Sequence, residues 1–409
     1  MAEQSRQVRN AGGKVELLAR QPHRAFAQTV AQGGIGDGTL QRHGQRLRVV
    51  GGDQQTGLAL AQEFGNARKR GRDAAKALAG GLDNDIGQPV AVAIGGDAAG
   101  QHEQVGPAIG VQHLPLVQRA APDIVITEAF PFGRRQMRFE LLPLLEAIAV
   151  MRPKPILCCS LRDILQEKTK PGRDAETVDL VLAHYDRVLV HGDPAFARLG
   201  DTFPLADRIA DRVVHTGLVA PPAPRPAAQG FDVVLSAGGG AVGEGLATAA
   251  LAAAAELPDL RLCLITGPNL PAGPRQALEA GLNALPQGRL LVETFRPDFA
   301  ALLAASRLSV SQAGYNTVCD VLQAGCRAIL IPFATGGETE QTTRATRLAA
   351  KGWADILRES ALDGPSLAAA IRQALAAPVP SRQGLDLDGA GRTADILYHL
   401  ADHRLTEVS

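Results

Sequence analysis

Between residues 116 and 220, short apolar runs alternate with longer amphipathic stretches. The runs DIVITEAF, PILCCSL and DRVLVHG have the length and β-branched content of buried strands. The stretches RFELLPLLEAIAVM and TVDLVLAHY instead repeat their apolar positions every three to four residues, as helices do. Strands and helices that alternate in this way predict a parallel sheet with helices on its faces.

The same alternation begins again at Phe231. Predicted strands are FDVVLS, RLCLITG, RLLVETF, RLSVSQAG and CRAILIPF, and predicted helices include GEGLATAALAAAAEL, PRQALEAGLNAL, DFAALLAAS and TTRATRLAAKG. Residues 231–380 are therefore predicted to form a second, doubly wound domain. The Pro-rich segment PPAPRPAAQG, residues 221–230, is the predicted linker, and residues 381–409 are predicted to contain a last amphipathic helix from about 389 to 403.

Residues 1–115 have a different texture, rich in Gln, Gly, Arg and His, with Phe26 and Phe64 as their only aromatic residues. The pieces LRVVGG and PVAVAIGG are predicted strands, and GLALAQEFGNARKRGRDAAKALAGG alone has helical periodicity. The fold class predicted for the chain is therefore α/β with two Rossmann-like domains, of which residues 1–115 make the first atypical or incomplete.

Composition narrows the class of partner. The 409 residues are 45% hydrophobic and 21% charged, and 42 basic residues balance 42 acidic ones. This balance argues against nucleic acid as a partner, and 4% aromatic residues leave little material for base stacking. The five cysteines lack metal-ligand spacing, which favours reduced thiols in a cytoplasmic protein. No apolar run approaches the roughly 20 residues of a membrane span, so we expect at most peripheral membrane contact.

A glycine-rich loop follows the first strand of the second domain. In SAGGGAVGEG, Gly238, Gly240 and Gly243 satisfy the dinucleotide pattern G-x-G-x-x-G. The next strand, RLCLITG, ends without the acid that would bind a cofactor ribose, so we expect no dinucleotide cofactor. Two interpretations stay open: close approach of a phosphate or sugar to the backbone, or a tight turn without ligand.

The segment SVSQAGYNTVCDVLQAG has a second candidate site. Gly314 is expected at the carboxyl end of a strand, with Asn316 or Thr317 capping the helix that follows. Asp320, which we expect in the first turn, could accept hydrogen bonds from two ribose hydroxyls at the mouth of the sheet. In the next strand-to-helix loop, IPFATGGETEQ, Glu338 and Gln341 belong either to a capping box or to a set of groups that face sugar hydroxyls.

These loops, in this order and spacing, resemble glycosyltransferase family 28. This MurG-like family of peptidoglycan N-acetylglucosaminyltransferases has the GT-B fold of two facing Rossmann-like domains. The similarity runs from about 231 to 376 through SAGGGAVGEG, VETFRPDFAALLAAS, SVSQAGYNTVCDVLQAGCRAILIPF and GETEQTTRATRLAAKG. The segments TEAFPFGRRQMRFELLPLLEA, SLRDIL and YDRVLVHGDP, between 122 and 219, resemble a subgroup of predicted bacterial glycosyltransferases.

The resemblance implies a binding site for a nucleotide-sugar donor. The diphosphate would lie by Ser236, Gly238, Gly239 and Gly240, and the base by Phe295 and Arg296. Asp320, where the family usually has Glu, would hold the ribose, with Gly314, Asn316 and Thr317 beside it. Glu338 and Gln341 would contact the donor sugar.

The implied activity is inverting transfer of a hexosyl group, from a UDP-sugar in preference, to a hydroxyl of an unknown carbohydrate or lipid-linked acceptor. No cofactor or metal is implied, and a D-x-D pattern from Asp386 to Asp388 lies in a C-terminal linker. Candidate bases are His191 and Glu128, each expected at the carboxyl end of a strand. Arg134, Arg135 and Arg138 are either a solvated helix start or a site for an acidic acceptor. A sugar-nucleotide epimerase and a non-catalytic nucleotide-binding remnant are the alternatives.

The sequence departs from the family at its start. Members begin with a strand and a G-x-G-H loop that often helps catalysis, whereas GGIGDGTLQRH, residues 33–43, has glycines and a later His without such a strand. One hypothesis is a mis-assigned or out-of-frame start, because GC-rich genes translated in another frame give this composition.

Overall fold

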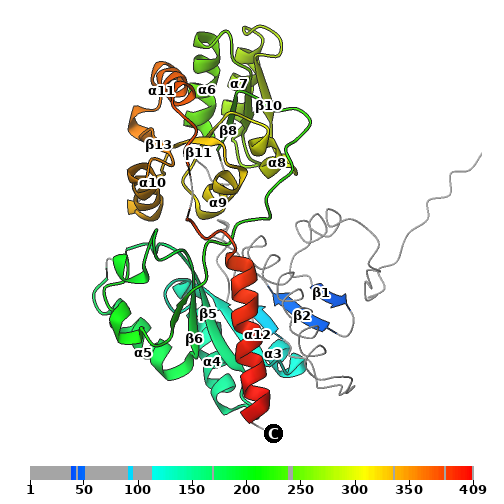
Figure 1. Cartoon of the computed structure of the whole chain (residues 1–409), viewed down its shortest axis with the longest axis vertical. Helices are drawn as coiled ribbons and strands as arrows, with labels where there is room; N and C mark the ends of the chain where they lie inside the picture. Colours follow the sequence, from blue (N-terminus) through cyan, green and yellow to red (C-terminus); the bar gives the residue numbers. More distant parts are fainter. Residues whose placement is uncertain are drawn as a thin grey trace, which may run out of the picture.

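The computed structural model describes residues 38–42, 45–50, 91–94 and 113–407, except for 168–169, 238–242, 335–336 and 382–383. The predicted helix within residues 57–81 lies outside these ranges. Two α/β domains form the two lobes of Figure 1, with the C-terminal helix α12 lying along the lower lobe. No helix in the described part of the chain combines the length and apolar character that a membrane span requires.

The first domain contains a seven-stranded sheet whose strands follow one another in chain order. The first two strands are antiparallel, and every later pair is parallel. Strands β2 and β3 correspond to LRVVGG and PVAVAIGG, so pieces of the N-terminal region extend the sheet predicted from residue 116 onward. The strands are β1 (Gly38–Arg42), β2 (Gln45–Val50), β3 (Ala91–Ile94), β4 (Ile124–Glu128), β5 (Ile156–Arg162), β6 (Arg187–His191) and β7 (Val213–His215).

Helices cover both faces of this sheet, but they come from opposite ends of the chain. The connecting helices α3 (His113–Ala120), α4 (Arg138–Val150) and α5 (Arg173–His184) pack on one face. Parallel crossovers that advance in one direction keep their helices on one side, because each crossover is right-handed. On the other face, α12 (Gly389–Glu407) packs Leu397 against the strands. The predicted C-terminal helix therefore completes the first domain.

The second domain contains a six-stranded, fully parallel sheet in the order β10-β9-β8-β11-β12-β13. The order of strands reverses between β8 and β11, so the sheet has the predicted doubly wound topology. Its strands are β8 (Val233–Ser236), β9 (Leu262–Ile265), β10 (Leu290–Glu293), β11 (Leu308–Ser311), β12 (Arg327–Leu330) and β13 (Asp355–Ile356).

Crossover helices of the second domain lie on both faces of its sheet. One face carries α6 (Gly243–Glu256), α7 (Ala272–Leu282) and α11 (Gly364–Ala376). The other carries α8 (Phe299–Ala304), α9 (Tyr315–Ala324) and α10 (Glu340–Ala350). Short 3-10 helices occupy Arg135–Met137, Leu199–Asp201, Ala206–Ile209 and Glu359–Ala361. The prediction of two α/β domains built on mainly parallel sheets is confirmed.

The two domains share a hydrophobic cluster. Ile164 and Phe196 of the first domain belong to the same buried group as Tyr315 and Val318 of the second. The chain just before the linker and the segment that returns to α12 also pair, through an antiparallel bridge between Val219 and Asp388. In Figure 1, α9 and α10 form the side of the upper lobe that faces the lower one.

Candidate functional site

The carboxyl ends of β8 and β11 mark the point where the strand order of the second sheet reverses. Open α/β sheets bind ligands in the crevice outside this point. Ser236 and Ser311 are paired there as the last residues of the two strands, and Ser236 is 8% exposed. The Ser311 hydroxyl is buried and has no hydrogen-bond partner among the described residues. The predicted diphosphate residues Gly238, Gly239 and Gly240 lie outside those residues.

Helix α9 begins at Tyr315, with Gly314 as its N-cap and no side-chain cap. The prediction that Asn316 or Thr317 caps this helix is therefore wrong, because both lie inside its first turn. The first residue of the helix is anchored in the fold: the Tyr315 hydroxyl donates to the His191 carbonyl oxygen (2.9 Å) and accepts from the Val219 amide (2.8 Å).

Gly314 has no reason within the described chain to be glycine. Its φ of −64° is open to any residue, and an added Cβ would meet no described atom within 4 Å. A side chain is thus absent where the chain itself leaves space, at the carboxyl edge of the sheet. This is what close approach of a ligand to the backbone requires.

Asp320 lies in the second turn of α9 rather than in the first, as the earlier helix start dictates. It is 8% exposed, and burial alone raises the pKa of its carboxyl to about 7. The carboxylate accepts no hydrogen bond from a residue of the described ranges. Because buried polar groups are nearly always paired, an acid in this state is a candidate for binding a ligand.

The side chain of Gln341 is held by the two strand ends beside it. Its Oε1 accepts hydrogen bonds from the backbone amides of Ala313 and Phe333, each at 3.2 Å. Its Nε2 meets no acceptor within the part of the chain that the structure describes. The two hydrogen bonds to Oε1 therefore fix the side-chain amide of Gln341, whose Nε2 has two hydrogens to donate.

Glu338 caps α10, because its Oε1 accepts from the Glu340 amide at 2.7 Å. The N-cap residue Thr339 makes no side-chain cap, so the predicted alternative of a capping box is excluded.

Phe295 and Arg296 follow β10, at the same edge of the sheet but two strands away from β8 in the sheet order. The Phe295 ring is 70% exposed. Arg296 is held by Glu293 and Asp298, at 3.1 and 2.9 Å, so its position beside Phe295 is fixed. An exposed ring at this edge can stack on a planar ligand group.

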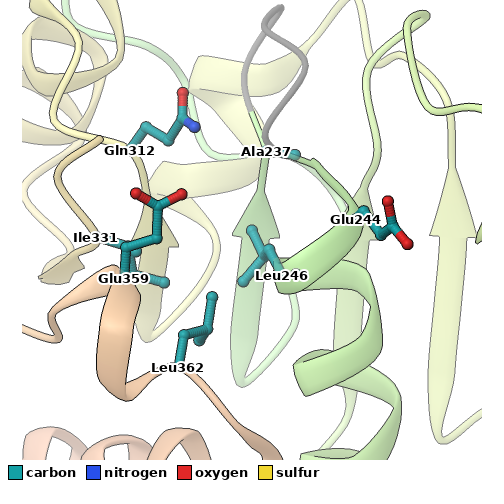
Figure 2. A pocket seen from close by; sticks show the side chains of 8 residues that line it. Ala237, Glu244, Leu246, Gln312, Ile331, Glu359 and Leu362 are labelled. Atoms are coloured by element: carbon teal, nitrogen blue, oxygen red, sulfur yellow. The ribbon is translucent and has the colours of Figure 1, made fainter. Parts of the chain in front are cut away.

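A cavity of about 220 Å³ opens beside the switch point. Figure 2 shows Leu246 and Leu362 at its apolar end and the Glu359 carboxylate directed toward Gln312. This cavity has no local sequence signal, because Glu359 and Leu362 follow β13 and reach the residues after β8 only through the fold.

His191 ends β6 at the edge of the first sheet. Its Nε2 lies 2.8 Å from Ser160 Oγ and its Nδ1 lies 2.9 Å from Thr216 Oγ1. Burial, helped by the charge of Arg162, lowers the pKa of His191 to about 4. The ring is 2% exposed, so this imidazole is neutral at pH 7 and is used within the protein.

The other candidate base, Glu128, ends β4 at the same edge. It forms an ion pair with Arg134 at 3.0 Å, with 23% of its side chain exposed. Ala129 and Arg134, on either side of this turn, have positive φ angles of 61° and 50°. Strained residues of this kind collect at functional sites.

Arg135 and Arg138 both pair with Glu176, at 2.6 and 2.5 Å. With the Arg134–Glu128 pair, each of the three arginines therefore already has an acidic partner.

No group of three or more potential metal ligands occurs among the described residues. Asp386, the first acid of the D-x-D pattern, pairs with Arg392 at 2.9 Å, and its amide donates to Asp193. Its role is in the segment that joins the domains.

The topology defines a doubly wound α/β domain, and the open groups at its switch point make a candidate ligand site at its carboxyl edge. Residues 236–381 match the glycosyltransferase family 28 C-terminal domain. The match covers slightly more than a third of the chain, and over it the second domain is similar to the C-terminal domain of that family.

Curated relatives match part of the chain. The chain is 33% identical over 151 residues to the UDP-N-acetylglucosamine–N-acetylmuramyl-(pentapeptide) pyrophosphoryl-undecaprenol N-acetylglucosamine transferase of Rhodospirillum centenum, covering 37% of this chain and 40% of that protein. It is 38% identical over 78 residues to the protein of the same name from Exiguobacterium sp., covering 19% and 22%. The chain thus matches two fifths or less of the length of these curated relatives.

Solved structures with similarity include the glycotransferase of kitacinnamycin, at a TM-score of 0.49 and 17% identity, covering 78% of this chain and 92% of that one. They also include Acinetobacter baumannii MurG, at a TM-score of 0.44 and 17% identity, covering 71% and 76%.

Proposed function

We propose that this protein transfers a hexosyl group from a nucleotide-diphosphate sugar, in preference a UDP-sugar, to an acceptor hydroxyl. The observation that carries the proposal is Asp320, a buried carboxylate that accepts no hydrogen bond from the described chain, at the edge of a family 28 domain. Two ribose hydroxyls would supply the missing donors. The curated relatives are named as transferases that use UDP-N-acetylglucosamine, which supports uracil as the nucleotide base.

The other proposed contacts to the nucleotide-sugar donor come from residues at the same edge of the second sheet. Gln341 would donate its amide hydrogens to a sugar hydroxyl, with Glu338 beside it. The diphosphate would lie near Ser236 and the glycine loop, in front of α6, and Gly314 would leave room for it. Helix N-termini and backbone amides would stabilise the charge that develops on the departing diphosphate, without a metal.

The proposed transfer requires a general base in the first domain, on the side where the acceptor would bind. We propose Glu128, which ends a strand of the first sheet and is partly exposed, in preference to the buried His191. Its carboxylate would take the proton of the acceptor hydroxyl as the oxygen attacks the anomeric carbon. The bond from that carbon to the diphosphate breaks, so the configuration inverts and a nucleoside diphosphate leaves. The relatives' names include an undecaprenol-linked acceptor, which supports a lipid-linked acceptor alongside a free carbohydrate.

Titration calorimetry of the full chain with UDP, ADP and GDP tests the donor site. We expect UDP to bind and Asp320→Ala to weaken it at least tenfold, because a hydrogen-bonded charged group is lost. Asp259→Ala, at an exposed position before β9, is the matched control. Unchanged affinity in Asp320→Ala would remove the donor-site assignment.

Hydrolysis of UDP-hexoses then separates an enzyme from a nucleotide-binding remnant. We expect slow release of UDP by the parent protein, and its loss in Glu128→Gln with UDP affinity retained. A protein that binds UDP but never releases it from any UDP-hexose would be the remnant.

A further inference from the structure

The segment after β5 of the first domain contacts the loop before α10 of the second. The Gln166 side chain donates from Nε2 to the Gly337 carbonyl oxygen at 2.7 Å. Its Oε1 accepts from the Thr339 amide at 3.0 Å. One amide thus binds the backbone on both sides of Glu338, as a neighbouring β-strand would.

Three residues earlier, the same segment is anchored by a buried ion pair. Asp163 accepts from Arg344 through both carboxylate oxygens, at 2.7 and 3.2 Å, and the side chains are 0% and 1% exposed. Arg344 also donates to the Ala313 carbonyl oxygen at 2.9 Å and to Glu340 at 2.7 Å. One guanidinium therefore links the first domain to the end of β11 and to the start of α10.

These two contacts have different strengths and therefore different roles. A fully buried, bidentate pair is costly to break, because Asp163 alone would be an uncompensated buried charge and Arg344 alone would keep only the partly exposed Glu340. The hydrogen bonds of Gln166 are exposed and individually weak. Asp163 thus fixes where the segment lies, while Gln166 determines the conformation of residues 337–339.

We propose that Gln166 is a positioning residue for the sugar half of the donor site, supplied by the opposite domain. This inference rests on the proposed function, in which Glu338 and Gln341 face the donor sugar. The loop that Gln166 holds contains none of the residues proposed to bind the nucleotide base or the ribose. Loss of Gln166 therefore weakens recognition of the sugar and leaves recognition of the nucleotide intact.

The experiment compares UDP with UDP-glucose and UDP-N-acetylglucosamine by titration calorimetry of the full chain. In Gln166→Ala, we expect about fivefold weaker binding of the UDP-hexose that binds tightest, and less than a twofold change for UDP. Gln166→Glu, which keeps the acceptor for Thr339 but not the donor to Gly337, should lose affinity for the UDP-hexose alone as well. Gln373→Ala, an exposed glutamine on α11, is the matched control and should bind both ligands as the parent does.

Hydrogen exchange tests the same proposal without a ligand. In Gln166→Ala, the Thr339 amide should exchange faster than in the parent, while peptides of α11 stay unchanged. The sugar-specific role would be overturned if Gln166→Ala lost equal affinity for UDP and UDP-hexose, or lost affinity for neither. It would also be overturned if the parent bound UDP-hexose no tighter than UDP. Unchanged exchange at Thr339 would overturn the positioning contact. A parent that binds none of UDP, ADP and GDP would instead contradict the proposed function, and the exchange result would still decide whether Gln166 holds the loop.

Discussion

The carboxyl edges of the two sheets differ in how their buried polar groups are used. On the first sheet, both ring nitrogens of His191 contact the hydroxyls of Ser160 and Thr216. On the second sheet, Asp320 and the Gln341 amide nitrogen find no such partner within the described chain. Since folded proteins rarely leave buried polar groups unpaired, the buried carboxyl of Asp320 makes the second edge the candidate for a ligand.

Burial shifts the pKa of both titratable groups toward the neutral form, and the consequences differ. The pKa of His191 falls to about 4, and the neutral ring serves its two neighbours. The pKa of Asp320 rises to about 7, so near neutral pH its charge is sensitive to any donor that arrives. The difference teaches that a buried group with a shifted pKa is a candidate for binding a ligand only where the group still lacks hydrogen-bond partners within the protein.

The contact that joins the two edges should give the largest effect. Asp163→Ala leaves the Arg344 guanidinium buried without its carboxylate partner from the first domain, and we expect a loss of about 3–5 kcal/mol in the free energy of unfolding. Urea denaturation of the full chain measures it. The double variant Asp163→Leu/Arg344→Met should recover most of this loss, because it removes both charges. A single-variant loss below about 1 kcal/mol would show that the pair does not hold the domains together.

A smaller loss of stability is expected when His191 is replaced at the carboxyl edge of the first sheet. His191→Leu removes the ring partner of two buried hydroxyls, of which that of Thr216 keeps backbone carbonyl acceptors, and should cost about 1–3 kcal/mol, with UDP affinity unchanged. The pKa of His191 is depressed in the folded state, so its contribution to stability is lost as the pH falls from about 6.5 to about 4. Denaturation at pH 7 and pH 5 should therefore show a smaller pH dependence in the variant. Weaker UDP binding without a loss of stability would assign His191 to the ligand instead.

At the open edge, Asp320→Asn should act on the ligand rather than on the fold. We expect about tenfold weaker binding of a UDP-hexose at pH 8, because the ionised carboxylate is the better acceptor. In the parent, affinity should rise with pH up to about 7 and then level off, whereas the variant should show a flat profile. The UDP-hexose is the proper probe, since both of its phosphates are esterified and do not titrate in this range.

Stability should change in the opposite direction at Asp320. The raised pKa means that the folded state holds this proton more tightly than the unfolded chain does. The free energy of unfolding of the ligand-free parent should therefore decrease as the pH rises from about 4 to about 7, and less so in Asp320→Asn. Identical pH profiles in parent and variant would mean that the carboxyl is not buried as described.

The smallest effect is expected at Gly314. Its backbone conformation is open to alanine, so Gly314→Ala should change the free energy of unfolding by less than about 1 kcal/mol. The added Cβ would enter the space proposed for the donor, and UDP-hexose affinity should fall about threefold to tenfold, measured by calorimetry. Gly273→Ala on α7, where a Cβ also meets no described atom, is the control and should leave affinity unchanged.

Much of this protein could be predicted from local pattern alone. Periodicity located β4 to β6 and the strands β8 to β12, because each buried element carries its own apolar repeat. The loops with Gly314, Asp320 and Gln341 could also be found, since strand-to-helix turns at a carboxyl edge have recognisable residue types. The contact that anchors Tyr315, the first residue of α9, could not, because its hydroxyl donates to a carbonyl oxygen 124 residues away.

The sequence by itself thus determined which segments are strands and helices and which loops could hold a donor. Only the tertiary structure decided that α12 covers the first sheet, that Asp163 meets Arg344 across 181 residues, and that Gln166 reaches the loop around Glu338. The physical reason is range: propensity and periodicity act between neighbours in the chain. Which acid is paired and which stays open depends on side chains that only the complete fold brings together.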